Sequence, residues 1–127
     1  MKPTLWMRVM FMLAAVYDGL LGAVFLLVPA WPFEQTGTPP PNHFGYIRFP
    51  AAVLIVFALM FAAVAWRPVR YRLFIPPGIG LKLAFCLTAA GYWVAQGIPM
   101  MFRPFCVIDA MFAALFVWAW VRLAEQH

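Results

Sequence analysis

The chain has 127 residues, of which 66% are hydrophobic and only 10% are charged. Soluble proteins carry roughly 25% charged residues, so the composition excludes a soluble globular domain and predicts an all-α integral membrane protein. The net charge of +5 does not indicate a nucleic-acid partner, because the basic residues gather at the ends of apolar segments, where they meet lipid headgroups. The length suits a single transmembrane domain, residues 1–127, of four helices of roughly 20 residues each.

The first helix is predicted at about 5–28 and ends at Pro29, which lacks the N–H that a continuing helix needs. Small residues recur along it at spacings of three and four, which predicts a face that packs closely against another helix. A carboxylate, Asp18, lies on this stripe, and its burial in lipid costs from about 2.5 to more than 10 kcal/mol unless it finds a partner. The stripe consists of Ala14, Ala15, Asp18, Gly19, Gly22 and Ala23.

Residues 29–50 form a long connection on the outer side of the predicted bundle, rich in proline and aromatic residues. We expect Pro39–Pro41 to be stiff and extended, as in polyproline II. The aromatic side chains suit the membrane interface, so the connection is predicted to lie across the bundle as a lid. These aromatic residues are Trp31, Phe33, Phe44, Tyr46 and Phe49.

Three more helices follow, at about 49–66, 73–97 and 103–123. The third begins near Leu73, or after Pro76 and Pro77, since proline suits a first helical turn. Polar and small residues share faces on the last two helices. On the third helix they are Lys82, Cys86, Ala89, Ala90 and Trp93; on the fourth they are Cys106, Asp109, Ala110, Ala113 and Ala114.

Basic residues are distributed unequally between the two predicted membrane sides. The side with both termini carries Lys2, Arg8, Arg67, Arg70, Arg72 and Arg122, whereas the other carries Arg48 and Arg103. Cytoplasmic segments hold the excess of Lys and Arg. We therefore expect a multi-pass protein of the bacterial inner membrane with cytoplasmic amino and carboxyl termini.

Depth counting predicts a partner for the first carboxylate. Ten residues separate Arg8 from Asp18, and ten separate Arg72 from Lys82, which places both side chains about 15 Å from the cytoplasmic boundary. We expect them to pair, either as an ion pair that sets helix register or as a proton-responsive anchor for a lipophilic ligand.

The second carboxylate, Asp109, is predicted near the opposite boundary. It lies six residues after Arg103, or about 9 Å inside that boundary. We expect Arg48, Arg103 or Tyr46 to reach it in a second polar cluster, with a structural hydrogen bond or a ligand contact as its role.

Candidates for contact with a ligand inside the membrane are Tyr17, Asp18, Tyr46, Arg48, Lys82, Tyr92, Trp93 and Asp109. No catalytic residue is assigned, because the sequence has no nucleophile–base set, phosphate loop or haem-attachment motif. The aromatic content of 18% either lines a pocket for a quinone, sterol, carotenoid or lipid or serves ordinary packing. No cofactor is otherwise evident.

The cysteines and histidines predict no metal site. His43 and His127 lie on opposite sides of the membrane, so they do not share a metal or a haem. Cys86 and Cys106 lie 20 residues apart on different helices and form no CxxC motif. We expect them to pack as apolar side chains, with a disulfide or a quinone-coupled thiol reaction as the alternatives.

The stretches YDGLLG, GYIRFPAAVLIVF and GIGLKL resemble small uncharacterised bacterial four-helix membrane proteins and, more remotely, the DoxX-like group. Some DoxX-like proteins associate with quinone-linked oxidoreductases. The resemblance covers nearly the whole chain and implies a role in the respiratory membrane.

Three functions are considered. The first is a non-catalytic accessory or structural subunit of a larger respiratory or photosynthetic complex, with other membrane proteins or further copies of itself as partners. The second is a protein or enzyme that binds a lipophilic molecule around Asp18, Lys82 and Asp109. The third is a small proton-coupled transporter, although broken helices and a clear internal repeat are missing.

Overall fold

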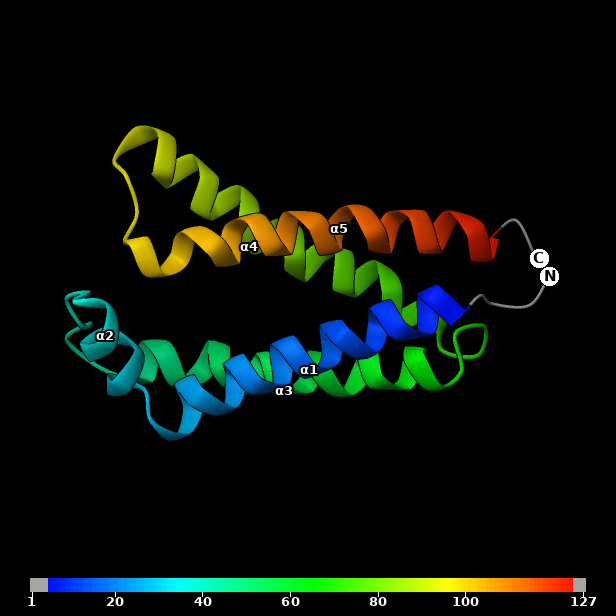
Figure 1. The fold of residues 1–127 in the computed structure, drawn as a ribbon, viewed down its shortest axis with the longest axis horizontal. Helices are drawn as coiled ribbons and strands as arrows, with labels where there is room; N and C mark the ends of the chain where they lie inside the picture. Colours follow the sequence, from blue (N-terminus) through cyan, green and yellow to red (C-terminus); the bar gives the residue numbers. More distant parts are fainter. Residues whose placement is uncertain (1–4, 125–127) are drawn as a thin grey trace.

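The computed structural model describes residues 5–124, and all regular structure in this range is helical. Four helices are long and apolar enough to cross a membrane, and a short fifth helix lies between the first two of them (Figure 1). The elements are α1 (Leu5–Leu27), α2 (Ala30–Thr36), α3 (Gly45–Trp66), α4 (Ile75–Ala95) and α5 (Arg103–Ala124). Two 3₁₀ turns, Arg72–Phe74 and Met100–Phe102, precede α4 and α5.

Proline and glycine set several helix ends. Helix α1 has 23 residues, about 35 Å of helix, and stops two residues before Pro29. Helix α4 carries Pro76 and Pro77 in its first turn, where a missing N–H is harmless. Gly37 ends α2 with a φ of 65°, and Gly97 follows α4 with a φ of 82°, the left-handed conformation that glycine adopts without strain.

The structure corrects the predicted lid and two predicted helix boundaries. Residues 30–36 of the predicted lid form helix α2. Helix α3 begins at Gly45 instead of residue 49, because hydrogen bonds to the Phe44 carbonyl open the first turn and Pro50 is accommodated inside the helix. Helix α4 ends at Ala95 instead of residue 97, because the N–H of Gly97 turns back to the carbonyls of Tyr92 and Trp93.

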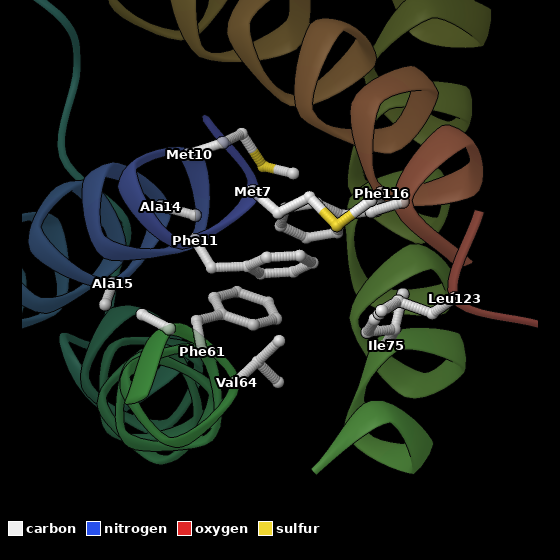
Figure 2. Close-up of a cluster of buried hydrophobic side chains, with 12 residues drawn as sticks. Met7, Met10, Phe11, Ala14, Ala15, Phe61, Val64, Ile75, Phe116 and Leu123 are labelled. Atoms are coloured by element: carbon white, nitrogen blue, oxygen red, sulfur yellow. The ribbon is translucent and has the colours of Figure 1, made fainter. Parts of the chain in front are cut away.

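The bundle consists of two helix pairs. Helix α1 packs along α3, and α4 packs along α5, whereas α3 and α4 touch much less (Figure 1). Three rings join the pairs at the end where α1 begins: Phe11 stacks on Phe116 with ring centroids 4.7 Å apart, and Phe61 meets Phe116 edge-on at 4.9 Å (Figure 2). All three side chains are fully buried, so this end of the bundle is tightly packed.

The connection between α1 and α3 covers the other end of the bundle. Phe33 of α2 is buried and meets Phe25 of α1 edge-on at 6.3 Å. Phe44 packs against Phe33, whereas Trp31, Tyr46 and Phe49 remain exposed. Only part of the aromatic set therefore faces the bundle.

The small-residue stripe of α1 packs against α3. A Cβ atom added at Gly22 would lie 2.7 Å from the carbonyl oxygen of Ala51 and 2.9 Å from Cγ1 of Ile55. Helix backbones approach this closely in membranes only where small residues lie between them.

Replacement of Gly22 by alanine is expected to destabilise the bundle by about 1–3 kcal/mol, because the Ala51 backbone must move to admit the methyl group. The matched control is Gly80→Ala, where an added Cβ meets nothing within 4 Å and gains up to about 1 kcal/mol of helix propensity. Thermal unfolding in mild detergent measures both. Equal midpoints for the two variants would contradict the close contact of α1 with α3.

Candidate functional site

Three ionisable side chains from three helices meet inside the bundle. The Lys82 ammonium of α4 donates hydrogen bonds to both carboxylate oxygens of Asp18 on α1, with Nζ–Oδ1 and Nζ–Oδ2 distances of 2.7 and 2.9 Å. It also donates to Oδ1 of Asp109 on α5 at 3.0 Å. The predicted pairing of Asp18 with Lys82 is confirmed, and Asp109 extends the pair to a cluster of three, called the ion cluster below.

The ion cluster is withdrawn from solvent to different degrees. Lys82 is 0% exposed and Asp18 is 1% exposed, whereas Asp109 retains 8%. A buried charge keeps its charged form only with close partners and hydrogen bonds. Asp18 and Lys82 therefore form the enclosed part of the ion cluster, and Asp109 forms its accessible edge.

Aromatic rings complete the surroundings of the lysine. Its Nζ lies 5.4 Å from the ring centre of Tyr17, 5.8 Å from that of Phe61 and 5.3 Å from that of Phe112. The negative faces of such rings attract a cation. The two carboxylates and these rings enclose the ammonium, and Lys82 is fully buried.

The formal charges of the ion cluster do not cancel. Two carboxylates face one ammonium, which leaves one negative charge in excess when all three groups are ionised. An oxygen without a partner accompanies this excess charge. Within the described residues, Oδ2 of Asp109 accepts no hydrogen bond from the protein. A proton or a cationic group bound at Asp109 would restore neutrality.

A cavity of about 470 Å³ lies beside the ion cluster, and both Asp18 and Asp109 line it. Its other walls are apolar and come from all four long helices. Phe49, Pro50 and Ala84 on its border are exposed, so the cavity opens between α3 and α4, which touch much less than the helices within each pair. The lining residues are Asp18, Leu21, Phe25, Ile47, Phe49, Pro50, Ala51, Val53, Leu54, Leu81, Ala84, Phe85, Phe102, Phe105 and Asp109.

A second groove, of about 720 Å³, lies between α1, α2 and the start of α5. Tyr17 lines it, and the Tyr17 hydroxyl is buried without a hydrogen-bond partner among the described residues. Leu21, Phe25 and Phe105 line both the groove and the cavity, and the two rings meet edge-on at 6.5 Å. The two spaces are therefore neighbours that share these three side chains.

The predicted second polar cluster around Asp109 is wrong, because Asp109 binds Lys82. The arginines expected there have other partners: Nε of Arg48 donates to the carbonyl of Leu26 in the last turn of α1 at 3.1 Å, and Nε of Arg103 donates to the carbonyl of Ile98 at 3.3 Å. Carbonyls at helix ends lack intrahelical partners and attract such donors. Depth counting along straight helices also neglected their tilt, which lets side chains of unequal predicted depth meet.

The structure thus brings together Tyr17, Asp18, Lys82 and Asp109 of the candidate ligand contacts. Tyr46 and Tyr92 are exposed on the surface. Arg48 is bound to the end of α1, and Trp93 lies under the Arg103 guanidinium at 5.4 Å. None of these four residues lines the cavity.

Both cysteines are reduced and buried. They lie together with Ala89 between α4 and α5, and the Cys106 thiol donates to the Cys86 carbonyl, with an Sγ–O distance of 3.6 Å. Residues 5–124 contain no group of three or more metal ligands. His43 accepts a hydrogen bond from the N–H of Gly45 through Nδ1, and His127 lies outside the described residues.

The aromatic neighbours of the ion cluster were not singled out from the sequence. Phe105, Asp109, Phe112 and Phe116 recur on α5 at spacings of four, three and four, which places them on one face. All four turn toward the bundle interior. This spacing could have identified the aromatic neighbours of the buried carboxylate; of the four residues, Phe105 and Asp109 line the cavity.

Comparison with protein-family models, with curated proteins and with solved structures finds no match to this chain. The resemblance to DoxX-like proteins therefore stays a prediction. The functional argument depends on the ion cluster and the cavity.

Proposed function

We propose that this protein is a small multi-pass membrane protein that binds a lipophilic molecule in the cavity between its four long helices. The polar end of the ligand lies against the ion cluster, and its apolar part lies along the walls formed by α3 and α4. The observation that supports this proposal is the position of two carboxylates at one wall of an otherwise apolar cavity.

Ligand pockets combine mostly apolar walls with a few polar groups that fix orientation, and volumes of about 300–1,000 Å³ are usual. The cavity, at about 470 Å³, falls in this range. An ionisable residue at bilayer depth is also a functional candidate in its own right. The cavity opens between membrane-spanning helices, which suits a ligand that arrives from the lipid.

The proposed location is the bacterial inner membrane, with the start of α1 and the end of α5 on the cytoplasmic side. Figure 1 shows the start of α1, the connection from α3 to α4 and the end of α5 at one end of the bundle. Arg8, Arg67, Arg70, Arg72 and Arg122 belong to these segments, whereas Arg48 and Arg103 belong to the first turns of α3 and α5, at the other end. Loops rich in Lys and Arg remain cytoplasmic.

The accessory-subunit and transporter functions stay predictions. The exposed apolar side chains of the long helices suit lipid as well as a partner subunit, so they do not distinguish between these surroundings. The sequence offered a quinone, sterol, carotenoid or lipid as ligand; the proposal here requires only a lipophilic molecule with a polar end, and no cofactor is assigned.

The test of the binding function is to fill the cavity. Ala84→Trp places an indole at the border of the cavity, and we expect a hydrophobic molecule that is enriched in the wild-type protein to fall at least about tenfold in the variant, as steric exclusion requires. Solvent extraction of the purified proteins followed by mass spectrometry measures it. The control is Ala114→Trp on α5, which is also exposed but lines neither the cavity nor the groove.

Equal extracts from wild type, Ala84→Trp and Ala114→Trp would refute a ligand in this cavity. The same preparations, made in mild detergent, are examined for a stoichiometric larger protein. Such a partner would support the accessory-subunit function instead.

A further inference from the structure

We infer that the ligand of the cavity carries a protonated amine, and that its ammonium binds Asp109 as the lipophilic tail occupies the apolar walls. The inference rests on the proposed function and specifies the chemical class of its ligand. Two independent features of the ion cluster lead to it: the kind of polar atom that a ligand can reach, and the charge that is left unbalanced.

A ligand in the cavity meets hydrogen-bond acceptors at the ion cluster and no donor from the lysine. Lys82 is fully buried and does not line the cavity, whereas Asp18 and Asp109 do. The Asp109 side chain is 11% exposed and has one oxygen, Oδ2, without a partner in the described protein. An ionised carboxylate accepts hydrogen bonds and donates none, so the matching head group is a donor.

The excess charge selects among donors. An alcohol would satisfy Oδ2 but brings no positive charge, so the ion cluster would have to take up a proton to become neutral in a low-dielectric site, where an unpaired charge is costly. A quaternary ammonium would balance the charge but has no N–H to donate. A primary ammonium does both, since hydrogen bonds between charged groups are the stronger class.

The other titratable and charged groups leave this assignment unchanged. Helix α1 adds Tyr17, which lines the groove and not the cavity and whose hydroxyl makes no hydrogen bond to the described residues. Helix α3 contributes apolar residues to the cavity wall, and its one charged side chain, Arg48, is bound to the Leu26 carbonyl. No described cation other than Lys82 contacts Asp109.

The test compares three probes of equal chain length: dodecylammonium, dodecanol and dodecyltrimethylammonium. Each is titrated at neutral pH into the protein in nanodiscs of phosphatidylcholine, and binding to protein-free nanodiscs is subtracted. We expect dodecylammonium to bind about tenfold or more tightly than either other probe, which is the gain of a charge-assisted hydrogen bond. Asp109→Asn makes the ion cluster formally neutral and should remove this preference.

The variant also has an internal control. If dodecanol binds Asp109→Asn as it binds wild type, the cavity is intact and the loss of ammonium preference belongs to the carboxylate. If Asp109→Asn does not fold, the ranking of the three probes on wild-type protein decides.

Equal binding of dodecanol and dodecylammonium to wild type, or an ammonium preference that survives in Asp109→Asn, would overturn the inference while leaving the lipophile-binding function in place. Binding of none of the three probes, together with identical extracts from wild type and Ala84→Trp, would overturn both.

Discussion

Replacement of Lys82 by methionine is expected to destabilise the protein by about 3–5 kcal/mol, the usual cost of removing one partner from a buried ion pair. Methionine keeps most of the volume of the lysine stem but leaves Asp18 and Asp109 facing each other without a cation. The loss is measured as the shift in the unfolding transition in mild detergent. It should exceed the loss for any other single change in the ion cluster.

The controls change the charge of the ion cluster without changing its shape. Asp109→Asn removes the excess negative charge and keeps an oxygen that accepts from Lys82, so it should cost less than Asp18→Asn, which replaces one of two accepting oxygens with an NH2 group. The triple variant Asp18→Asn, Lys82→Met, Asp109→Asn carries no charge there and should regain much of what Lys82→Met alone loses. Additive losses in the triple variant would show that the three side chains do not act as one unit.

The second large effect is expected from Phe61→Ala, at about 3 kcal/mol, the lower end for buried aromatic residues. Phe61 is fully buried, lies 4.9 Å from Phe116 and 6.3 Å from Phe11 between ring centres (Figure 2), and faces the Lys82 ammonium. Lipid is as apolar as the bundle interior, so the loss comes from van der Waals contacts between helices more than from transfer to water.

Leu59→Ala on the same helix is the matched comparison, because Leu59 is 68% exposed. It should change stability by less than about 0.5 kcal/mol. The two variants are compared by thermal unfolding in the same detergent. A loss for Leu59→Ala as large as that for Phe61→Ala would mean that α3 does not present Phe61 to the other helices as described.

The four long helices could be predicted from hydropathy because each is an apolar run of the length that a bilayer requires. Their ends were predicted less well. The second long helix was predicted to start at Phe49, where the uncharged run begins, but α3 begins at Gly45 and includes Arg48. Helix α2 was missed because its seven residues lie in a segment whose prolines and aromatic residues give no helical period.

Three of the eight candidate ligand contacts could be identified by the cost of charge in an apolar segment. That cost singled out Asp18, Lys82 and Asp109, and equal depth paired the first two. Equal depth did not identify the partner of Asp109, because a four-carbon lysine stem and tilted helices make depth along the helix axis a poor guide to which side chains touch.

By itself, the sequence determined that the chain forms long apolar helices and that three buried ionisable groups need partners, since both conclusions depend only on composition and on the energetics of charge. Tertiary structure alone decided that one lysine serves two carboxylates and that Asp109 keeps an open oxygen beside a cavity. The physical reason is that partners and cavities arise from how helices from distant parts of the chain cross and separate, which no local pattern of residues records.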